Sequence, residues 1–180
     1  MRKLILYIAS SLDGYIAGPE NELDWLVTEG DYGYDEFFDS IDTVLSGRIT
    51  YDEAVKMGMK DPFPGKTTYV FTSKPSDFNS TDNLIFTSDD PVKMWKSLKE
   101  KEGKDAWLVG GGGLIKYFIE QDLIDEYRIF IHPIILGKGI PLFKQIDYRV
   151  NLITEEVKKF DTGLIMLKLR TMSWDKPSNI

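Results

Sequence analysis

Short apolar runs alternate along the chain with segments whose apolar residues recur at helical spacing. Continuous runs such as Leu4–Ala9 have the length of a buried strand, and a strand without polar alternation is typical of a parallel sheet covered on both faces. The pattern predicts eight strands, at Leu4–Ala9, Thr43–Ser46, Thr67–Thr72, Leu84–Thr87, Ala106–Val109, Glu126–His132, Leu152–Phe160 and Leu164–Thr171.

Helical spacing predicts four helices, at Tyr34–Ile41, Thr50–Met57, Pro91–Lys101 and Leu114–Glu120. The third has the clearest boundaries, because Asp89 and Asp90 can cap it, Pro91 suits a first turn and Gly103 can end it. After Gln121 no helix intervenes, so the last strands can pair as antiparallel neighbours. The order predicts one α/β domain over residues 1–180, with a mostly parallel sheet and an antiparallel C-terminal edge.

Four consecutive glycines, Gly110–Gly113, separate the strand that ends at Val109 from the helix that begins at Leu114. Without side chains, an anion can approach the free N–H groups at the amino end of a helix, so the segment favours a nucleotide diphosphate site. Ile115 replaces the third glycine of G-x-G-x-x-G, and no Gly-Lys-Ser/Thr follows, so neither common nucleotide motif is present. The alternative is a turn whose glycines only allow close packing.

Two further elements suit a phosphate at the end of a strand. Ser46-Gly47-Arg48-Ile49-Thr50 joins a strand to a helix through a glycine, and Arg48 and Thr50 add a guanidinium and a hydroxyl that suit a phosphate. Thr72-Ser73-Lys74 follows the next strand with two hydroxyls and a cation. All three elements follow strands, and ligands of open α/β sheets bind at the carboxyl ends of strands. We therefore expect them to line one crevice.

Composition narrows the choice of partners. The formal charge is −7 and no Lys/Arg-rich run is present, which argues against nucleic acid. With no cysteine and one histidine, we predict no disulfide, no metal site and no Ser-His-Asp triad. The apolar N-terminal run is short and continues into Ser10-Ser11-Leu12, which favours a buried strand over a secretory signal. We predict a cytoplasmic protein with no membrane partner, since no run approaches spanning length.

These segments together resemble the dihydrofolate reductase superfamily. Ala9–Ala17 is similar to its first strand and mobile loop, Ser46–Tyr51 to its G-R-x-T phosphate segment, Phe71–Lys74 to its adenosine segment, and Val109–Phe118 to its glycine turn. The segment His132–Phe143, with P-x-x-L-G-x-G-x-P-L-F, resembles the branch that contains the C-terminal reductase domain of the bifunctional riboflavin-biosynthesis deaminase/reductase.

The resemblance implies a dihydrofolate reductase-like α/β/α fold, NADPH as cofactor and a homodimer. It implies that the diphosphate lies between Gly47–Thr50 and Gly111–Leu114, that the nicotinamide lies beside Ala9 and Ile16, and that Leu12–Asp24 closes as a lid. The cofactor-binding residues that it implies are Ala9, Ile16, Gly47, Arg48, Thr50, Thr72, Ser73, Lys74, Val109, Gly111, Gly112, Gly113 and Leu114.

On the substrate side, the resemblance implies that Trp25, Tyr34 and Phe38 contact the substrate. Folate reductases carry a carboxylate on the first helix, but here Tyr34 occupies that position. Asp31 and Asp35 are nearby but off register, and they are the candidates for a catalytic acid. We therefore expect hydride transfer to a C=N substrate such as 5-amino-6-(5-phosphoribosylamino)uracil, with folate or pteridine reduction, or nucleotide binding without turnover, as alternatives. His132 is more typical of a structural or rim residue than of a base.

Overall fold

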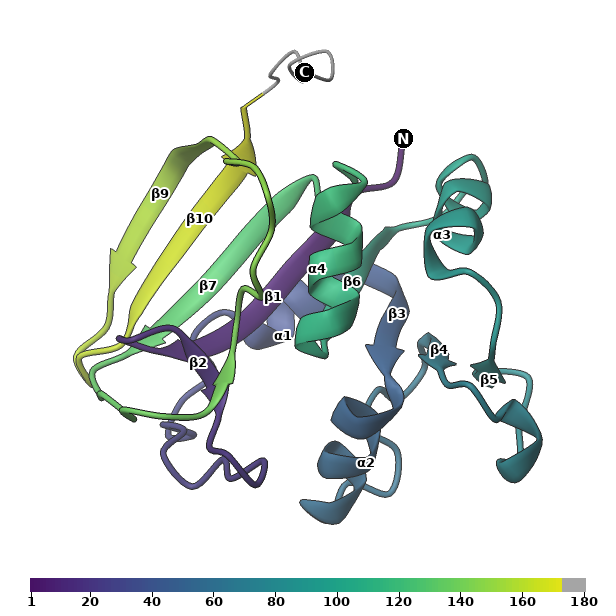
Figure 1. Cartoon of the computed structure of the whole chain (residues 1–180), viewed down its shortest axis with the longest axis horizontal. Coiled ribbons are helices and arrows are strands. Elements are labelled where there is room, and N and C mark those ends of the chain that lie inside the picture. Colours follow the sequence, from purple (N-terminus) through teal and green to yellow (C-terminus); the bar gives the residue numbers. More distant parts are fainter. Residues whose placement is uncertain (173–180) are drawn as a thin grey trace.

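The computed structural model describes residues 1–172 and contains one large sheet flanked by helices (Figure 1). The eight strands of this sheet lie in the order β5-β4-β3-β6-β1-β7-β10-β9. Their bounds are Leu4–Ser11 for β1, Ile41–Gly47 for β3, Thr67–Phe71 for β4, Leu84–Thr87 for β5, Asp105–Gly110 for β6, Glu126–His132 for β7, Leu152–Lys159 for β9 and Ile165–Thr171 for β10.

The strands from β5 to β7 are parallel, and β10 pairs antiparallel with both β7 and β9. This confirms the predicted sheet with an antiparallel C-terminal edge. The chain passes from β7 to the edge strand β9 and returns as β10 between them, so β7 and β9 are not neighbours. β9 exposes Glu155, Glu156, Lys158 and Lys159, and charges on an edge strand discourage pairing with another chain.

The helices cover the sheet on both faces, which makes three layers (Figure 1). On one face, Trp95 of α3 (Pro91–Lys99) and Phe118 of α4 (Gly112–Glu120) pack with Leu4 and Leu6 of β1. On the other, Phe37 of α1 (Tyr34–Ser40) packs with Ile5 and Trp107. Neighbouring residues of β1 therefore point to opposite cores, which explains why this strand is apolar throughout.

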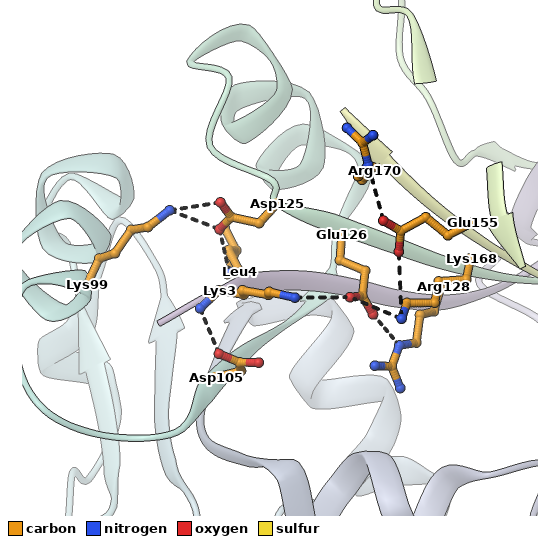
Figure 2. A network of polar contacts seen from close by, with 10 residues as sticks. All are labelled: Lys3, Leu4, Lys99, Asp105, Asp125, Glu126, Arg128, Glu155, Lys168 and Arg170. Atoms are coloured by element: carbon orange, nitrogen blue, oxygen red, sulfur yellow. Dashed lines mark hydrogen bonds and ion pairs between the residues drawn. The ribbon is translucent and has the colours of Figure 1, made fainter. Parts of the chain in front are cut away.

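A network of charged residues ties the sheet together near the amino ends of β1 and β7 (Figure 2). Glu126, only 4% exposed, accepts a hydrogen bond from Nε of Arg128 at 2.5 Å. The ammonium groups of Lys3 and Lys168 each lie 3.8 Å from its carboxylate. A buried carboxylate needs such partners. These contacts join the first parallel strand to the antiparallel edge, at the end of the sheet opposite to the glycine turns.

The structure differs from the sequence prediction in its short elements. A two-stranded ribbon of β2 (Tyr15–Ala17) and β8 (Ile140–Pro141), and the 3₁₀ turn η1 (Pro75–Asp77), were not predicted, because runs of two or three residues carry no periodicity. Helix α2 (Arg48–Lys56) and α4 each begin two residues earlier than predicted. None of the helices in residues 1–172 is long and apolar enough to cross a membrane.

Candidate functional site

The two glycine turns lie against each other at the carboxyl edge of the sheet. A Cβ on Gly47, which ends β3, would lie 3.4 Å from the carbonyl oxygen of Gly110 and 3.9 Å from Cα of Gly111. A Cβ on Gly111 would lie 3.4 Å from the hydroxyl of Thr50. The amino ends of α2 and α4 therefore meet where both backbones lack side chains, and they bring two sets of free helix N–H groups to one place.

The four glycines of the second turn have different roles. Gly110 and Gly111 have φ values of +138° and +90°, which other residues rarely adopt. A Cβ on Gly112 would lie 3.1 Å from the carbonyl oxygen of Pro141, so packing alone accounts for this glycine. Gly113 is exposed and open. The turn thus serves packing at Gly112, and it leaves Gly111 and Gly113 at the surface where a ligand can approach.

Lys144 is a cation beside this turn that the sequence analysis did not identify. Its Cε lies 3.3 Å from the position of a Cβ on Gly112, and its Nζ lies 3.7 Å from that on Gly113. The Lys144 side chain makes no hydrogen bond or ion pair within residues 1–172. A helix N-terminus carries partial positive charge, so an ammonium here is favourable only when an anion lies between them. Lys144 follows β8, and an isolated lysine in a loop gives no sequence signal.

The residues expected at the adenosine end lie on neighbouring strands. Gly47 pairs with Phe71 across β3 and β4, so Arg48 and Thr72 follow at adjacent strand ends. The guanidinium of Arg48 forms an ion pair with Asp52 one helical turn later. Ser73 and Lys74 are exposed, and the hydroxyl of Thr72 accepts a hydrogen bond from the N–H of Lys74 at 3.3 Å. Two cations and three hydroxyls, counting Thr50, therefore follow β3 and β4.

The residues expected near the nicotinamide come from β1, β2 and β6. Ala9 is half-buried near the carboxyl end of β1, and Ile16 packs on the same core as Ile8. Val109 is the extra residue of a β-bulge, since Leu45 pairs with Leu108 but Ser46 pairs with Gly110. Bulges re-aim the chain near functional sites. Leu114, in the first turn of α4, also packs on this core.

The predicted lid is tied to the loop between β7 and β8. The carboxylate of Asp13 accepts hydrogen bonds from the Ser11 hydroxyl at 2.7 Å and from the N–H groups of Leu136 at 3.1 Å and Gly137 at 2.8 Å. The Ser11 bond, with help from the two N–H groups, holds the pKa of Asp13 below its usual value. β2 then pairs with β8. An open groove of about 310 Å³ separates the lid from α2, lined by Asn21, Leu23, Asp24, Glu53, Lys56 and Met57.

The aromatic residues expected at the substrate form two groups. Tyr34 and Phe38 stack on one another at 5.5 Å, and Tyr34 also meets Trp107 and Tyr7 edge-on. Burial raises the pKa of Tyr7 far above its usual value, so this tyrosine stays neutral. Trp25 is not in contact with this cluster and instead meets His132 edge-on at 5.1 Å. This second pairing was not predicted, because the two residues lie 107 positions apart in the chain.

Asp31 and Asp35, the candidates for a catalytic acid, are both exposed. The carboxylate of Asp31 accepts hydrogen bonds from the N–H groups of Gly33 and Asp35, so it caps the start of α1. Asp35 lies on the first turn of this helix, where an acidic residue favours the helix dipole. Helix capping is a sufficient physical reason for both residues.

The fold and the arrangement of its strand-end elements place the protein among dihydrofolate reductase-like α/β proteins. The dihydrofolate reductase of Enterococcus faecalis, complexed with NADP(H), shares the fold, with a TM-score of 0.70, 22% identity, and coverage of 95% of this chain and 97% of that one. Residues 2–166 match the RibD C-terminal domain family, and the chain belongs to that family. The branch predicted from the P-x-x-L-G-x-G-x-P-L-F segment is thereby confirmed.

Two other relatives agree with this assignment. The uncharacterized protein YwjB of Bacillus subtilis (strain 168) is 38% identical over 162 residues, covering 88% of this chain and 92% of YwjB. A solved structure from Shewanella sp. PV-4, named as a candidate riboflavin biosynthesis protein, has a TM-score of 0.83 at 25% identity and covers 95% of this chain and 99% of that one. The family suggests a reductase related to the riboflavin pathway.

Proposed function

We propose that this protein is an NADPH-dependent reductase that transfers hydride to a C=N substrate, in the manner of a 5-amino-6-(5-phosphoribosylamino)uracil reductase. The observation that carries the proposal is the contact between the two glycine turns. The missing side chains of Gly47 and Gly111 let the amino ends of α2 and α4 meet beside the Thr50 hydroxyl. A diphosphate fits this place, because it needs closely spaced N–H donors and a backbone that it can approach.

The residues around this contact divide the binding of the dinucleotide between them. The N–H groups at Gly112 and Gly113, the Thr50 hydroxyl and the Lys144 ammonium would hold the diphosphate. Arg48, Ser73 and Lys74 would hold the 2′-phosphate of the adenosine ribose, and Ala9, Ile16 and Val109 would flank the nicotinamide. When bound, NADPH supplies the hydride; the protein supplies orientation and a water-poor crevice.

A folate substrate is less favoured by this site. Folate reductases use a carboxylate on the first helix, whereas the corresponding face of α1 presents Tyr34 and Phe38. The nearby carboxylate of Asp31 is held by two backbone N–H groups. A C=N group in an opened sugar needs hydride delivery at carbon, for which orientation contributes most of the rate. The aromatic pair suits the flat ring of an aminouracil.

Cofactor choice tests the first half of this proposal. A charge-assisted hydrogen bond contributes about 1.5–3 kcal/mol, so two such contacts to a 2′-phosphate should give at least about a hundredfold preference for NADPH over NADH. We expect Arg48→Ala to remove about tenfold of that preference and Lys74→Glu to remove more. The control is Lys159→Glu, which makes the same charge change on the far edge strand. Calorimetric dissociation constants for both cofactors decide it: equal wild-type affinities would overturn the assignment.

Turnover tests the second half. NADPH oxidation should be followed with the deaminated aminouracil ribotide, with its dephosphorylated riboside and with dihydrofolate. Oxidation that depends on either aminouracil compound supports the proposal, and oxidation with dihydrofolate alone contradicts it. Tight NADPH binding with no oxidation in any of the three would instead identify a nucleotide-binding protein without turnover.

A further inference from the structure

His132 connects the loop that carries Trp25 to the sheet. It is the last residue of β7, is only 3% exposed, and pairs with Ser11 across β1 and β7. Its Nδ1 accepts a hydrogen bond from the N–H of Val27 at 3.2 Å. The Trp25 indole meets the imidazole edge-on, with 5.1 Å between ring centroids and 87° between planes.

The Val27 bond anchors an irregular segment. Residues 23–29 contain neither helix nor strand. Within the described chain, the other hydrogen bonds of this segment are local, such as the one from the Trp25 indole N–H to the carbonyl of Glu22 and the one from the Leu26 N–H to the carbonyl of Leu23. The bond to His132 crosses 105 positions in the sequence and reaches the central sheet. It therefore decides where this loop lies relative to the crevice.

The bond requires the neutral form of the imidazole. Because Nδ1 accepts the Val27 N–H, the ring proton must be on Nε2. An imidazolium carries a proton on both nitrogens and has no acceptor to offer. Protonation of His132 would thus set an N–H group against the Val27 N–H and break the anchor.

We propose that His132 is a positioning residue, which in its neutral form fixes Trp25 and Val27 at the substrate end of the crevice. The role rests on the proposed function, since it concerns substrate held beside the cofactor. His132 does not act on the reacting atoms; it acts through the loop. Protonation releases the loop and weakens substrate binding, while the diphosphate and adenosine contacts at α2 and α4 are unchanged.

The surroundings of the His132 ring set the direction in which substrate binding depends on pH. Burial lowers the pKa of His132 below its ordinary value of about 6.5, so the ring is neutral at pH 7. The stabilising contribution of the hydrogen bond between His132 and Val27 is complete above about pH 6.5, and it is lost as the pH falls through the lowered pKa of His132. The ionisable residues on the segments around the ring are Asp13, Glu22, Asp24, Glu29 and Lys138. Asp13 lies in the lid, and its hydrogen bonds, led by the one from the Ser11 hydroxyl, hold the pKa of its carboxyl below the usual value.

The experiment compares two substitutions of the imidazole. His132→Asn keeps an acceptor, the amide oxygen, near the position of Nδ1 but cannot titrate, whereas His132→Phe keeps a ring without an acceptor. Hydrogen exchange of the Val27 amide is the first measurement. We expect exchange in the Phe variant to be about tenfold faster than in wild type, and exchange in the Asn variant to match wild type. Equal protection in all three proteins would overturn the proposal.

A second measurement separates this role from ordinary packing and from the proposed function. In the Phe variant the KM for substrate should be about tenfold higher than in wild type, with little change in NADPH affinity. The Asn variant should have the wild-type KM at neutral pH, and its KM should not rise at acidic pH as the wild-type KM does. If no substrate is turned over, the proposed function fails. Hydrogen exchange of the Val27 amide and the pH dependence of Trp25 fluorescence still test the role of His132 in that case. Comparison with Trp25→Phe identifies the part of the fluorescence that comes from Trp25. If the Phe variant does not fold, Val27→Pro removes the hydrogen-bond donor instead. A pH dependence of Trp25 fluorescence that is the same in Val27→Pro as in wild type would then overturn the proposal.

Discussion

At the scale of single residues, the four consecutive glycines show that one residue type can be needed for different reasons. Gly110 and Gly111 adopt positive φ, Gly112 makes room for the carbonyl of Pro141, and a Cβ on Gly113 would meet the Lys144 ammonium at 3.7 Å. Ligand binding and packing are therefore not exclusive roles for this turn: packing accounts for Gly112, and ligand binding at Gly111 and Gly113 stays a prediction. The ligand role can be tested only by a substitution whose effect on backbone strain is distinguished from its effect on the space open to a ligand.

Gly111→Ala is such a substitution when it is compared with Gly65→Ala. Both positions have positive φ, +90° and +74°, but a Cβ on Gly65 would meet nothing within 4 Å, whereas one on Gly111 would enter the contact with Thr50 and Gly47. Both variants should lose about 1–2 kcal/mol of unfolding free energy from backbone strain. Only Gly111→Ala should also weaken NADPH binding, by about tenfold. Equal cofactor affinities in the two variants would show that the glycine turn serves packing only.

Lys144 gives a second prediction at this scale, because binding and stability should move in opposite directions. Lys144→Glu puts an acidic group at the amino end of α4, which should raise the unfolding free energy of the free protein by about 0.3–1 kcal/mol. It should lower NADPH and NADH affinity alike, by at least about tenfold, since both share the diphosphate. The control, Lys138→Glu, makes the same charge change in the loop that precedes β8. A variant that lost stability or kept its affinity would contradict this role.

At the scale of elements, the lid is held by a side chain and by a short ribbon. Asp13 joins the start of the lid to Leu136 and Gly137, and the N–H of Leu142 donates to the carbonyl of Gly14 at 2.8 Å. β2 and β8 are too short for their pattern to predict them, yet they fix where residues 12–24 lie. The position of this segment therefore depends on contacts with a loop more than a hundred residues away.

We expect Asp13→Ala to separate turnover from binding. It removes the acceptor for two backbone N–H groups and the Ser11 hydroxyl, so the lid should close less completely and the hydride-transfer rate should fall about tenfold or more. Binding of 2′,5′-adenosine diphosphate should not change. Stopped-flow measurement of hydride transfer and calorimetry with this fragment make the comparison, with the exposed Asp82→Ala as control. Equal losses in both measurements would show that the segment is only structural.

At the scale of the whole molecule, the two ends of the sheet are built differently. Glycines, hydroxyl groups and the predicted lid lie at the carboxyl ends of the parallel strands. The ion-pair network around Glu126 lies at their amino ends (Figure 2). Glu126 joins Arg128 of its own strand, Lys168 of β10 and Lys3 before β1. The network thus fixes the antiparallel edge on the parallel core without occupying the crevice.

Removal of Glu126 should therefore change stability and leave the site intact. Glu126→Ala leaves the partly buried Arg128 without its carboxylate and should lower the unfolding free energy by about 3 kcal/mol. Glu155→Ala is the matched control, because this exposed carboxylate pairs with Arg170 and Lys168 but should contribute less than about 1 kcal/mol. Urea unfolding measures both, and NADPH affinity should be unchanged in each. Equal stability losses would contradict the importance of burial here.

Apolar runs of strand length, glycines before helices and polar residues after strands are local patterns, so the parallel core and the three strand-end elements could be predicted from the sequence alone. The family could be predicted in the same way, from segments such as His132–Phe143. Contacts between distant segments are not encoded in any local pattern and appear only in the folded structure. It brought Gly47 against Gly111, Lys144 against the amino end of α4, and His132 against Trp25 and Val27. These pairs lie far apart in the chain and meet only through strand order, so their chemistry depends on the folded sheet.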